Sequence, residues 1–381
     1  MTQPLKKLRV LELARVLAGP WAGQTLADLG ADVIKVEAPT GDETREWGPP
    51  FHKDGSASYF HSTNRGKKSL VANLKDSEDL RLVKNLASKA DVLIENFKVG
   101  TLSKFKLDYA NIRKCNPKIV YCSITGFGQT GPYAKRSGYD FIVQAMGGIM
   151  DLTGEEYGSP QKPGIAYADI FTGLYSVVGI LAGLQAAEKT GEGTHIDMAL
   201  FDTQLGVLAN QASTYITTGK IPRRMGNAHP VIVPYQVFEV KNGSIVIACG
   251  NDNQFKKMCE ALNLSFHLDE QYKTNKLRVK NRQKLIPKIK RVLEKYEKEE
   301  VLLILEKVGV PAGPINNVKQ ALEDKQSIFR NMKMKSETGY YLNNPIKFNN
   351  LCLGDNSYSP KLGANTQEIK KAVKNGYLWN D

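Results

Sequence analysis

Strand and helix patterns alternate along the N-terminal half of the chain, and this alternation constrains the fold more than any other feature. The first unit is a strand at residues 8–13, a helix at 21–29 and a strand at 32–37. Pro20 stands at the first expected helical position and Gly30 just beyond the last one, where these residues are preferred. A β-α-β unit requires parallel strands joined by a crossover helix. The sequence therefore predicts an α/β protein with a doubly wound parallel sheet.

The alternation continues to residue 217 and is followed by a region of different composition. Further strands are expected at 69–74, 91–96, 118–124 and 194–200, and helices at 77–89, 102–114, 139–150 and 201–217. Residues 218–234 read as a linker or active-site loop. An Asn242-Gly243 hairpin and a lysine-rich helical section at 253–308 then indicate a smaller α+β domain, with 309–317 as the return linker.

Composition is that of an ordinary globular protein. Of its residues, 41% are hydrophobic and 24% are charged. The length of 381 residues is enough for two domains. The N-terminus passes straight into a strand pattern, so we expect no signal peptide. Five scattered cysteines without a C-x-x-C pair indicate a reducing compartment, and we expect the cytoplasm or an organelle matrix. Neither the cysteines nor the five dispersed histidines form a metal-binding pattern, so we expect no metal site. The net charge is +13, but the sequence contains no nucleic-acid-binding signature. The positive charge also suits a polyanionic nucleotide ligand.

A long apolar segment of small residues at 164–187 contains a single acid near its start, Asp169. The segment is too short and too glycine-rich for a convincing membrane span, so we expect a buried helix. Aspartate is a preferred N-cap residue, and the helix dipole would favour its ionised form. A carboxylate placed there suits attack on an acyl carbon, although capping alone is the commoner role of such an acid.

Ligands of doubly wound sheets bind outside the carboxyl ends of the strands, which here lead into residues 15–18, 96–98 and 125–131. A glycine pattern at 126–131 superficially suggests a nicotinamide dinucleotide site. That interpretation fails because the pattern does not lie in the first strand-to-helix turn, where a single glycine is followed by Pro20. A lone G-x-G-x-x-G elsewhere is a weak signal.

Several motifs, in their order and spacing, resemble the class III CoA-transferase family (CaiB/BaiF, formyl-CoA transferase type). They are R-V-L-A-G-P at 15–20, A-D-V-I-K-V-E at 31–37, G-D-E-T-R-E-W-G-P-P at 41–50, E-N-F-K-V-G at 95–100, the step at 137–140 and the Asp169 segment. The resemblance covers essentially the whole chain and looks closest to the branch that transfers CoA from succinyl-CoA to glutarate.

The resemblance implies a reaction and an architecture. Asp169 matches the family's nucleophile, which attacks an acyl-CoA thioester and becomes an aspartyl-CoA thioester before CoA passes to an acceptor acid. The CoA thioester is thus a substrate, and no permanent cofactor is implied. The family fold further implies a Rossmann-like large domain from residues 1–217 and 309–381, a small domain from 218–308, and an interlocked homodimer without nucleic acid or membrane partners.

The resemblance also implies three groups of binding residues. Acyl-pocket positions are matched by Trp47, Tyr59 and Tyr139, and the family's glycine-rich loop by Gly226, Asn227 and His229, although this loop has one glycine here. CoA would be contacted by Arg15, Val16, Leu17, Asn96, Phe97, Lys98, Lys104 and Arg136. A cation is needed for the distal carboxylate of a dicarboxylate, and we expect Arg45 ahead of Arg223 and Arg224.

Alternative functions stay open on the sequence. The family's 2-methylacyl-CoA racemases carry a histidine where this chain has Tyr139, and tyrosine lacks a pKa near neutrality, which favours acyl exchange over α-proton chemistry. Leu17 replaces the glutamine of formyl-CoA transferases, which argues against formate or oxalate as the main substrate. The alternative from another class is a non-catalytic CoA-binding or nucleic-acid-binding protein.

Overall fold

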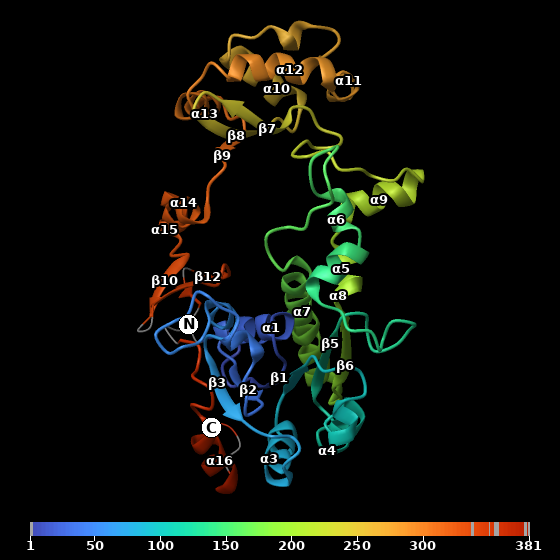
Figure 1. The fold of residues 1–381 in the computed structure, drawn as a ribbon, viewed down its shortest axis with the longest axis vertical. Helices are drawn as coiled ribbons and strands as arrows, with labels where there is room; N and C mark the ends of the chain where they lie inside the picture. Colours follow the sequence, from blue (N-terminus) through green and yellow to red (C-terminus); the bar gives the residue numbers. More distant parts are fainter. Residues whose placement is uncertain (1–2, 337–338, 350, 354–357, 377–378, 380–381) are drawn as a thin grey trace. The chain divides into compact units, whose positions relative to one another are not determined.

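The computed structural model describes residues 3–336, 339–349, 351–353, 358–376 and 379 (Figure 1). These residues form two compact units. Unit 1 comprises residues 1–149, 162–220 and 325–381, and unit 2 comprises residues 150–161 and 221–324. Unit 2 therefore takes in residues 150–161 and 309–324, which the sequence analysis left in the large domain.

Unit 1 is built on a six-stranded parallel sheet with the order β3-β2-β1-β4-β5-β6 (Figure 1). The strands are β1 Arg9–Leu13, β2 Asp32–Glu37, β3 Lys67–Val71, β4 Val92–Glu95, β5 Val120–Thr125 and β6 Thr194–Ala199. The predicted α/β class and parallel sheet are confirmed. The strand order reverses between β1 and β4, which is where doubly wound sheets bind their ligands.

Helices cover both faces of this sheet because successive strand residues point to opposite sides. Val10 lies in one hydrophobic core and its neighbour Leu11 in the other. The Leu11 core includes side chains from α3 (Ser77–Ala87), α4 (Tyr109–Cys115) and α16 (Thr366–Lys374). The Val10 core includes side chains from α1 (Ala18–Asp28), α5 (Asp140–Met146), α7 (Tyr167–Thr190) and α8 (Leu200–Gly206).

The C-terminal segment returns to unit 1 and covers the edge strand β3. The Asn365 side chain accepts the Ser69 N–H at 3.1 Å, and the Thr366 hydroxyl accepts the Val71 N–H at 3.0 Å. An edge strand otherwise leaves such donors unpaired. Residues from both ends of the chain thus complete unit 1.

Helix α7 passes very close to α1. A Cβ atom added at Gly173 would lie 2.7 Å from the backbone oxygen of Ala18, so only glycine permits this approach. Among the described residues, α7 is the one helix long and apolar enough to cross a membrane, with a mean hydropathy of 1.6. In unit 1 it packs against α1, β5 and β6, but it is less buried than predicted, because one of its sides, with Leu174, Tyr175 and Val178, is exposed.

Two predicted helices are each divided in two. The 139–150 prediction is observed as α5 and α6 (Ile149–Leu152), separated at Gly148, whose φ is 86°. The 201–217 prediction is observed as α8 and α9 (Ala209–Thr218), and Ala209 has a φ of 45°. A glycine pair at 147–148 marks the first interruption, and Gly206, the last residue of α8, stands just before the second.

Residues 235–314 of unit 2 form a three-stranded antiparallel sheet with the order β7-β8-β9 and four α-helices. They are β7 Tyr235–Val240, β8 Gly243–Ala248 and β9 Ala312–Pro314, with α10 Asp252–Ala261, α11 Asn275–Lys280, α12 Arg282–Leu293 and α13 Lys298–Lys307. Val240 pairs with Gly243, as the predicted hairpin requires. The expected linker at 309–317 in fact contains β9, a strand of three residues that the glycines and prolines around it conceal.

The remaining elements are short. They are η1 Glu43–Arg45, α2 Ser58–His61, η2 Leu102–Phe105, η3 Phe266–Leu268, α14 Val318–Glu323, α15 Lys325–Phe329, β10 Lys333–Ser336, β11 Gly339–Leu342, β12 Lys347–Phe348 and β13 Leu351–Cys352.

Candidate active site

A cavity of about 360 Å³ opens in unit 1 where the strand order reverses. The chain segments after β1, β4 and β5 form its walls, together with the start of α5 and the first turn of α7. The sequence-predicted residues that line it are Arg15, Val16, Leu17, Asn96, Phe97, Lys98, Arg136, Tyr139 and Asp169. Residues that lie far apart in the sequence thus surround one space at the ligand-binding edge of the sheet.

The loops after β1 and β4 are tied to each other. The Arg15 N–H donates to the Asn96 side-chain oxygen at 2.9 Å, and the Asn96 amide donates to the Arg15 carbonyl at 2.7 Å. The Arg15 guanidinium pairs with Glu43 at 2.8 Å, and Arg136 lies over the ring of Tyr133. These contacts fix cationic side chains at the cavity wall, where an anionic ligand would meet them.

Asp169 lies in the first turn of α7 but does not cap the helix, so the predicted capping role is wrong. The N-cap is Ala166, and Asp169 is the third helical residue. Asp140 caps the helix instead, because its Oδ1 accepts the N–H groups of Ala168 at 2.8 Å and of Asp169 at 3.2 Å. The Gln144 amide holds the other Asp140 oxygen at 2.7 Å. This second acid lies in the 137–140 motif, but its role depends on a contact that no local pattern reveals.

The surroundings of Asp169 disfavour its ionised form. This is the opposite of what its expected position at the positive end of the helix dipole predicts. Burial, and then the negative charge of Asp140, raise the pKa of Asp169 to about 7. Within the described part of the chain, no side chain donates a hydrogen bond to its carboxylate. Asp169 therefore faces the cavity as a weakly solvated carboxylate without a cationic partner, which is a reactive arrangement for an oxygen nucleophile.

Tyr59 and Trp47 lie outside the cavity lining but next to each other. Their rings meet edge to face, with centroids 5.2 Å apart. Burial, and then the carboxylates of Asp169 and Asp140, raise the pKa of Tyr59 to about 12. The charges of both acids thus act on Tyr59, and its hydroxyl stays protonated near pH 7, so it can donate a hydrogen bond.

Arg45 forms a buried ion pair with Glu37, which disfavours its expected role of binding the distal carboxylate of the substrate. Its Nε and Nη2 donate to the two oxygens of Glu37, each at 2.8 Å, and the guanidinium lies 3.7 Å from the centroid of the Phe60 ring. The residue is 9% exposed. A paired and buried arginine is not available for the distal carboxylate of a substrate. Lys104, on η2, is exposed and does not line the cavity.

The remaining predicted residues belong to unit 2, where the loop at 224–229 is held by the segment 151–155. Arg224 pairs with Asp151 at 2.8 Å, and the Gly226 N–H donates to the Gly154 carbonyl at 3.0 Å. The Nδ1 atom of His229 accepts the Val231 N–H at 3.2 Å. Burial, and then the charge of Arg282, lower the pKa of His229, so its ring is neutral near pH 7. Asn227 and Arg223 are exposed.

Comparison with known proteins identifies the family of this chain. The family model "CoA-transferase family III" matches residues 5–366. This chain belongs to the CoA-transferase family III. It is 50% identical over 378 residues to a protein of Agrobacterium fabrum named succinate–glutarate CoA-transferase, with 96% of this chain and 94% of that one covered. It is 43% identical over 381 residues to a Homo sapiens protein named succinyl-CoA:glutarate CoA-transferase, with 97% and 86% covered.

A solved structure supports the same assignment for this CoA-transferase. The crystal structure of a CaiB/BaiF family protein from Brucella suis superimposes with a TM-score of 0.89 and 52% sequence identity, covering 98% of this chain and all of that one. The family predicted from the motifs is confirmed. No group of three or more metal-ligating side chains occurs among the residues that the structure describes.

Proposed function

We propose that this CoA-transferase moves CoA from succinyl-CoA to glutarate, with Asp169 as the nucleophile. The observation that carries the proposal is the cavity at the β1–β4 reversal, because it brings Asp169 together with the residues expected to bind CoA. The two curated relatives cover nearly the whole chain and carry names with this pair of substrates. The CoA thioester enters as a substrate, and the reaction needs no permanent cofactor, nucleic acid or membrane.

The first half-reaction exchanges the thioester for an enzyme-bound one. An oxygen of Asp169 attacks the thioester carbon of succinyl-CoA, the carbon–sulfur bond breaks, and CoA leaves as a thiolate. The product is a mixed anhydride between Asp169 and succinate. The thiolate then attacks the Asp169 carbonyl carbon, which releases succinate and leaves Asp169 as a CoA thioester.

The second half-reaction is the reverse sequence with a new acid. A glutarate carboxylate attacks the aspartyl thioester and displaces the CoA thiolate. The thiolate attacks the glutaryl carbon of the new anhydride, which gives glutaryl-CoA and restores the Asp169 carboxylate. Negative charge develops on oxygen and sulfur in every step, so fixed donors accelerate the reaction. The cations that line the cavity, and that suit the phosphates of CoA, are Arg15, Lys98, Lys135 and Arg136.

The same proposal includes a homodimer in the cytoplasm. Helix α7 is apolar on all sides, yet Leu174, Tyr175 and Val178 on it are 40–64% exposed in unit 1. A second copy of the chain would bury them. The described cysteines at positions 115, 122, 249 and 259 are free thiols, as a reducing compartment favours.

The decisive experiment is to trap the intermediate. We expect incubation with succinyl-CoA alone, followed by digestion and mass spectrometry, to find a CoA-sized adduct or its hydroxylamine product on the peptide around Asp169. The D169A variant should fold, bind CoA and show neither adduct nor exchange. Product formation by D169A at a rate near that of the wild type would show that Asp169 is not the nucleophile.

Two further arms test the substrates and the competing reaction. A panel of acceptor acids, read by mass spectrometry of the acyl-CoA products, should show glutarate among the best. Incubation with a 2-methylacyl-CoA in deuterium oxide should give no deuterium at the α-carbon. Uptake at the rate of turnover would establish the racemase instead.

A further inference from the structure

Val16 has a backbone conformation that a valine rarely adopts. Its φ is 69°, in the left-handed region, where the branched Cβ is crowded. Val16 lies between the end of β1 and the start of α1 and lines the cavity. A residue held this way requires surrounding contacts that impose the conformation.

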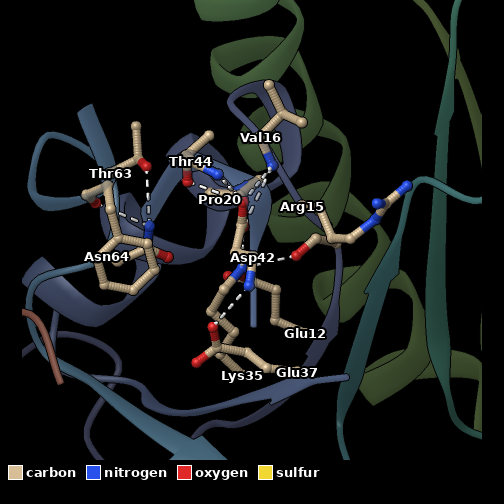
Figure 2. A network of polar contacts seen from close by, with 12 residues as sticks. Glu12, Arg15, Val16, Pro20, Lys35, Glu37, Asp42, Thr44, Thr63 and Asn64 are labelled. Atoms are coloured by element: carbon tan, nitrogen blue, oxygen red, sulfur yellow. Dashed lines mark hydrogen bonds and ion pairs between the residues drawn. The ribbon is translucent and has the colours of Figure 1, made fainter. Parts of the chain in front are cut away.

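Those contacts come from a buried ion pair behind the cavity wall (Figure 2). Both carboxylate oxygens of Asp42 face the Val16 N–H, at 3.3 and 3.4 Å. The Lys35 ammonium lies 2.9 Å from Asp42 and donates to the Ala14 carbonyl at 2.7 Å. One ion pair therefore holds the turn on both sides, since Lys35 binds the residue before Arg15 and Asp42 binds the residue after it.

The rest of the network keeps Asp42 charged and fixed. Thr44 donates to Asp42 through its backbone N–H at 3.0 Å and through its hydroxyl at 2.8 Å. Burial alone would raise the pKa of Asp42, but the Lys35 ammonium and the Thr44 hydrogen bonds lower it below its usual range. The side chains of Lys35 and Asp42 are both fully buried. An apolar pair would fill this space at a smaller desolvation cost, so stability alone does not explain the charges.

We propose that Lys35 and Asp42 are positioning residues for the CoA pocket: they hold Val16 in the left-handed conformation and thereby direct Arg15, Val16 and Leu17 toward the cavity. This inference rests on the proposed CoA pocket and extends it to two side chains that touch no substrate. If the inference is right, removal of the Asp42 charge weakens CoA binding only while residue 16 carries a side chain that resists the left-handed conformation.

A double-mutant cycle between D42N and V16G tests the inference. Glycine adopts positive φ without steric cost, so the turn no longer needs Asp42 once Val16 is replaced. We expect D42N to weaken CoA binding, measured by titration calorimetry, roughly tenfold in the native chain but less than about threefold in the V16G background. KM for succinyl-CoA should rise with Kd, while kcat stays within about twofold because Asp169 lies on another element. An equal loss in both backgrounds would overturn the proposal.

Two controls keep the outcome decisive. If D42N alone does not fold, K35M/D42N replaces it, because this variant removes both members of the ion pair. Glu12, which also pairs with Lys35 at 3.1 Å, keeps its 2.7 Å contact with Lys67 in that variant. The same tenfold loss, and the same relief by V16G, is expected of that variant, and its absence would refute the proposal. The assignment of the cavity to CoA is tested separately with a K98A variant. Unchanged CoA binding by K98A would show that the cavity does not bind CoA.

Discussion

The Asp169 carboxylate must be ionised to attack an acyl carbon, yet its surroundings raise its pKa to about 7. As the pH falls through this value, the nucleophile becomes protonated, and kcat/KM for succinyl-CoA should decrease about tenfold per pH unit below it. The D140N variant should move the midpoint of this profile downward, because asparagine keeps the oxygen that caps α7 but removes the negative charge beside Asp169. The profile is measured from pH 5.5 to 8.5 with initial rates.

A matched control separates charge from capping. The D140A variant loses the charge and the cap together, so it should show the same shift of midpoint and also lose about 1 kcal/mol of stability in urea denaturation. An unchanged midpoint in D140N would mean that Asp140 does not influence the titration of Asp169.

Single residues also mark the limit of what the sequence can predict. The sequence singled out Asp169 and eight other residues that line the cavity, most of which lie at a strand end or at the start of a helix. The motifs failed for Arg45, whose bidentate contact with Glu37 joins the end of β2 to η1. They also missed Asp140 as the cap of α7, because a side chain far away in the sequence replaces the local capping residue.

At the level of elements, the contact between α1 and α7 sets the geometry of the site, because Ala18 and Asp169 both line the cavity. In the G173A variant the added methyl group would lie 2.7 Å from the Ala18 oxygen and 3.0 Å from the Trp21 Cβ. We expect this overpacking to cost about 1–3 kcal/mol in urea denaturation and to lower turnover, since the helices must separate.

The same helix provides the control for this prediction. In the G179A variant the nearest atom, from the Ile196 side chain, is 3.4 Å from the new methyl group. Alanine favours a helix over glycine by up to about 1 kcal/mol, so G179A should be neutral or stabilising. Equal stability of the two variants would show that the α1–α7 approach tolerates a side chain.

Elements were predictable from sequence where their ends carry strong signals. Strand β2 has the predicted bounds, and α3 begins at the predicted residue, Ser77, because Asp76 caps it. Helix α8 ends at Gly206, a signal for a break that the predicted 201–217 helix passed over, and β9 is recognisable as a strand only through its pairing with β8. Periodicity indicates elements, but breaks and short edge strands are decided by tertiary contacts.

For the whole molecule, the apolar surface of α7 leads to the prediction of self-association. A helix that is apolar all round is normally buried all round, yet Val178 is 64% exposed in unit 1 and Tyr175 is 50% exposed. On α5, Phe141 and Ile142 are also exposed. We expect light scattering after size exclusion to give twice the mass of the chain, and the V178E variant to shift the protein toward the monomer, because a carboxylate in an apolar interface is costly to desolvate.

A charge added elsewhere should leave the assembly intact. Gln283 is an exposed residue of α12 in unit 2, and the Q283E variant introduces the same charge without touching the apolar surface. Circular dichroism of V178E should match wild type, which separates dissociation from unfolding. A wild-type protein that runs as a monomer at micromolar concentration would contradict the dimer, and the exposed face of α7 would then need another partner to explain its composition.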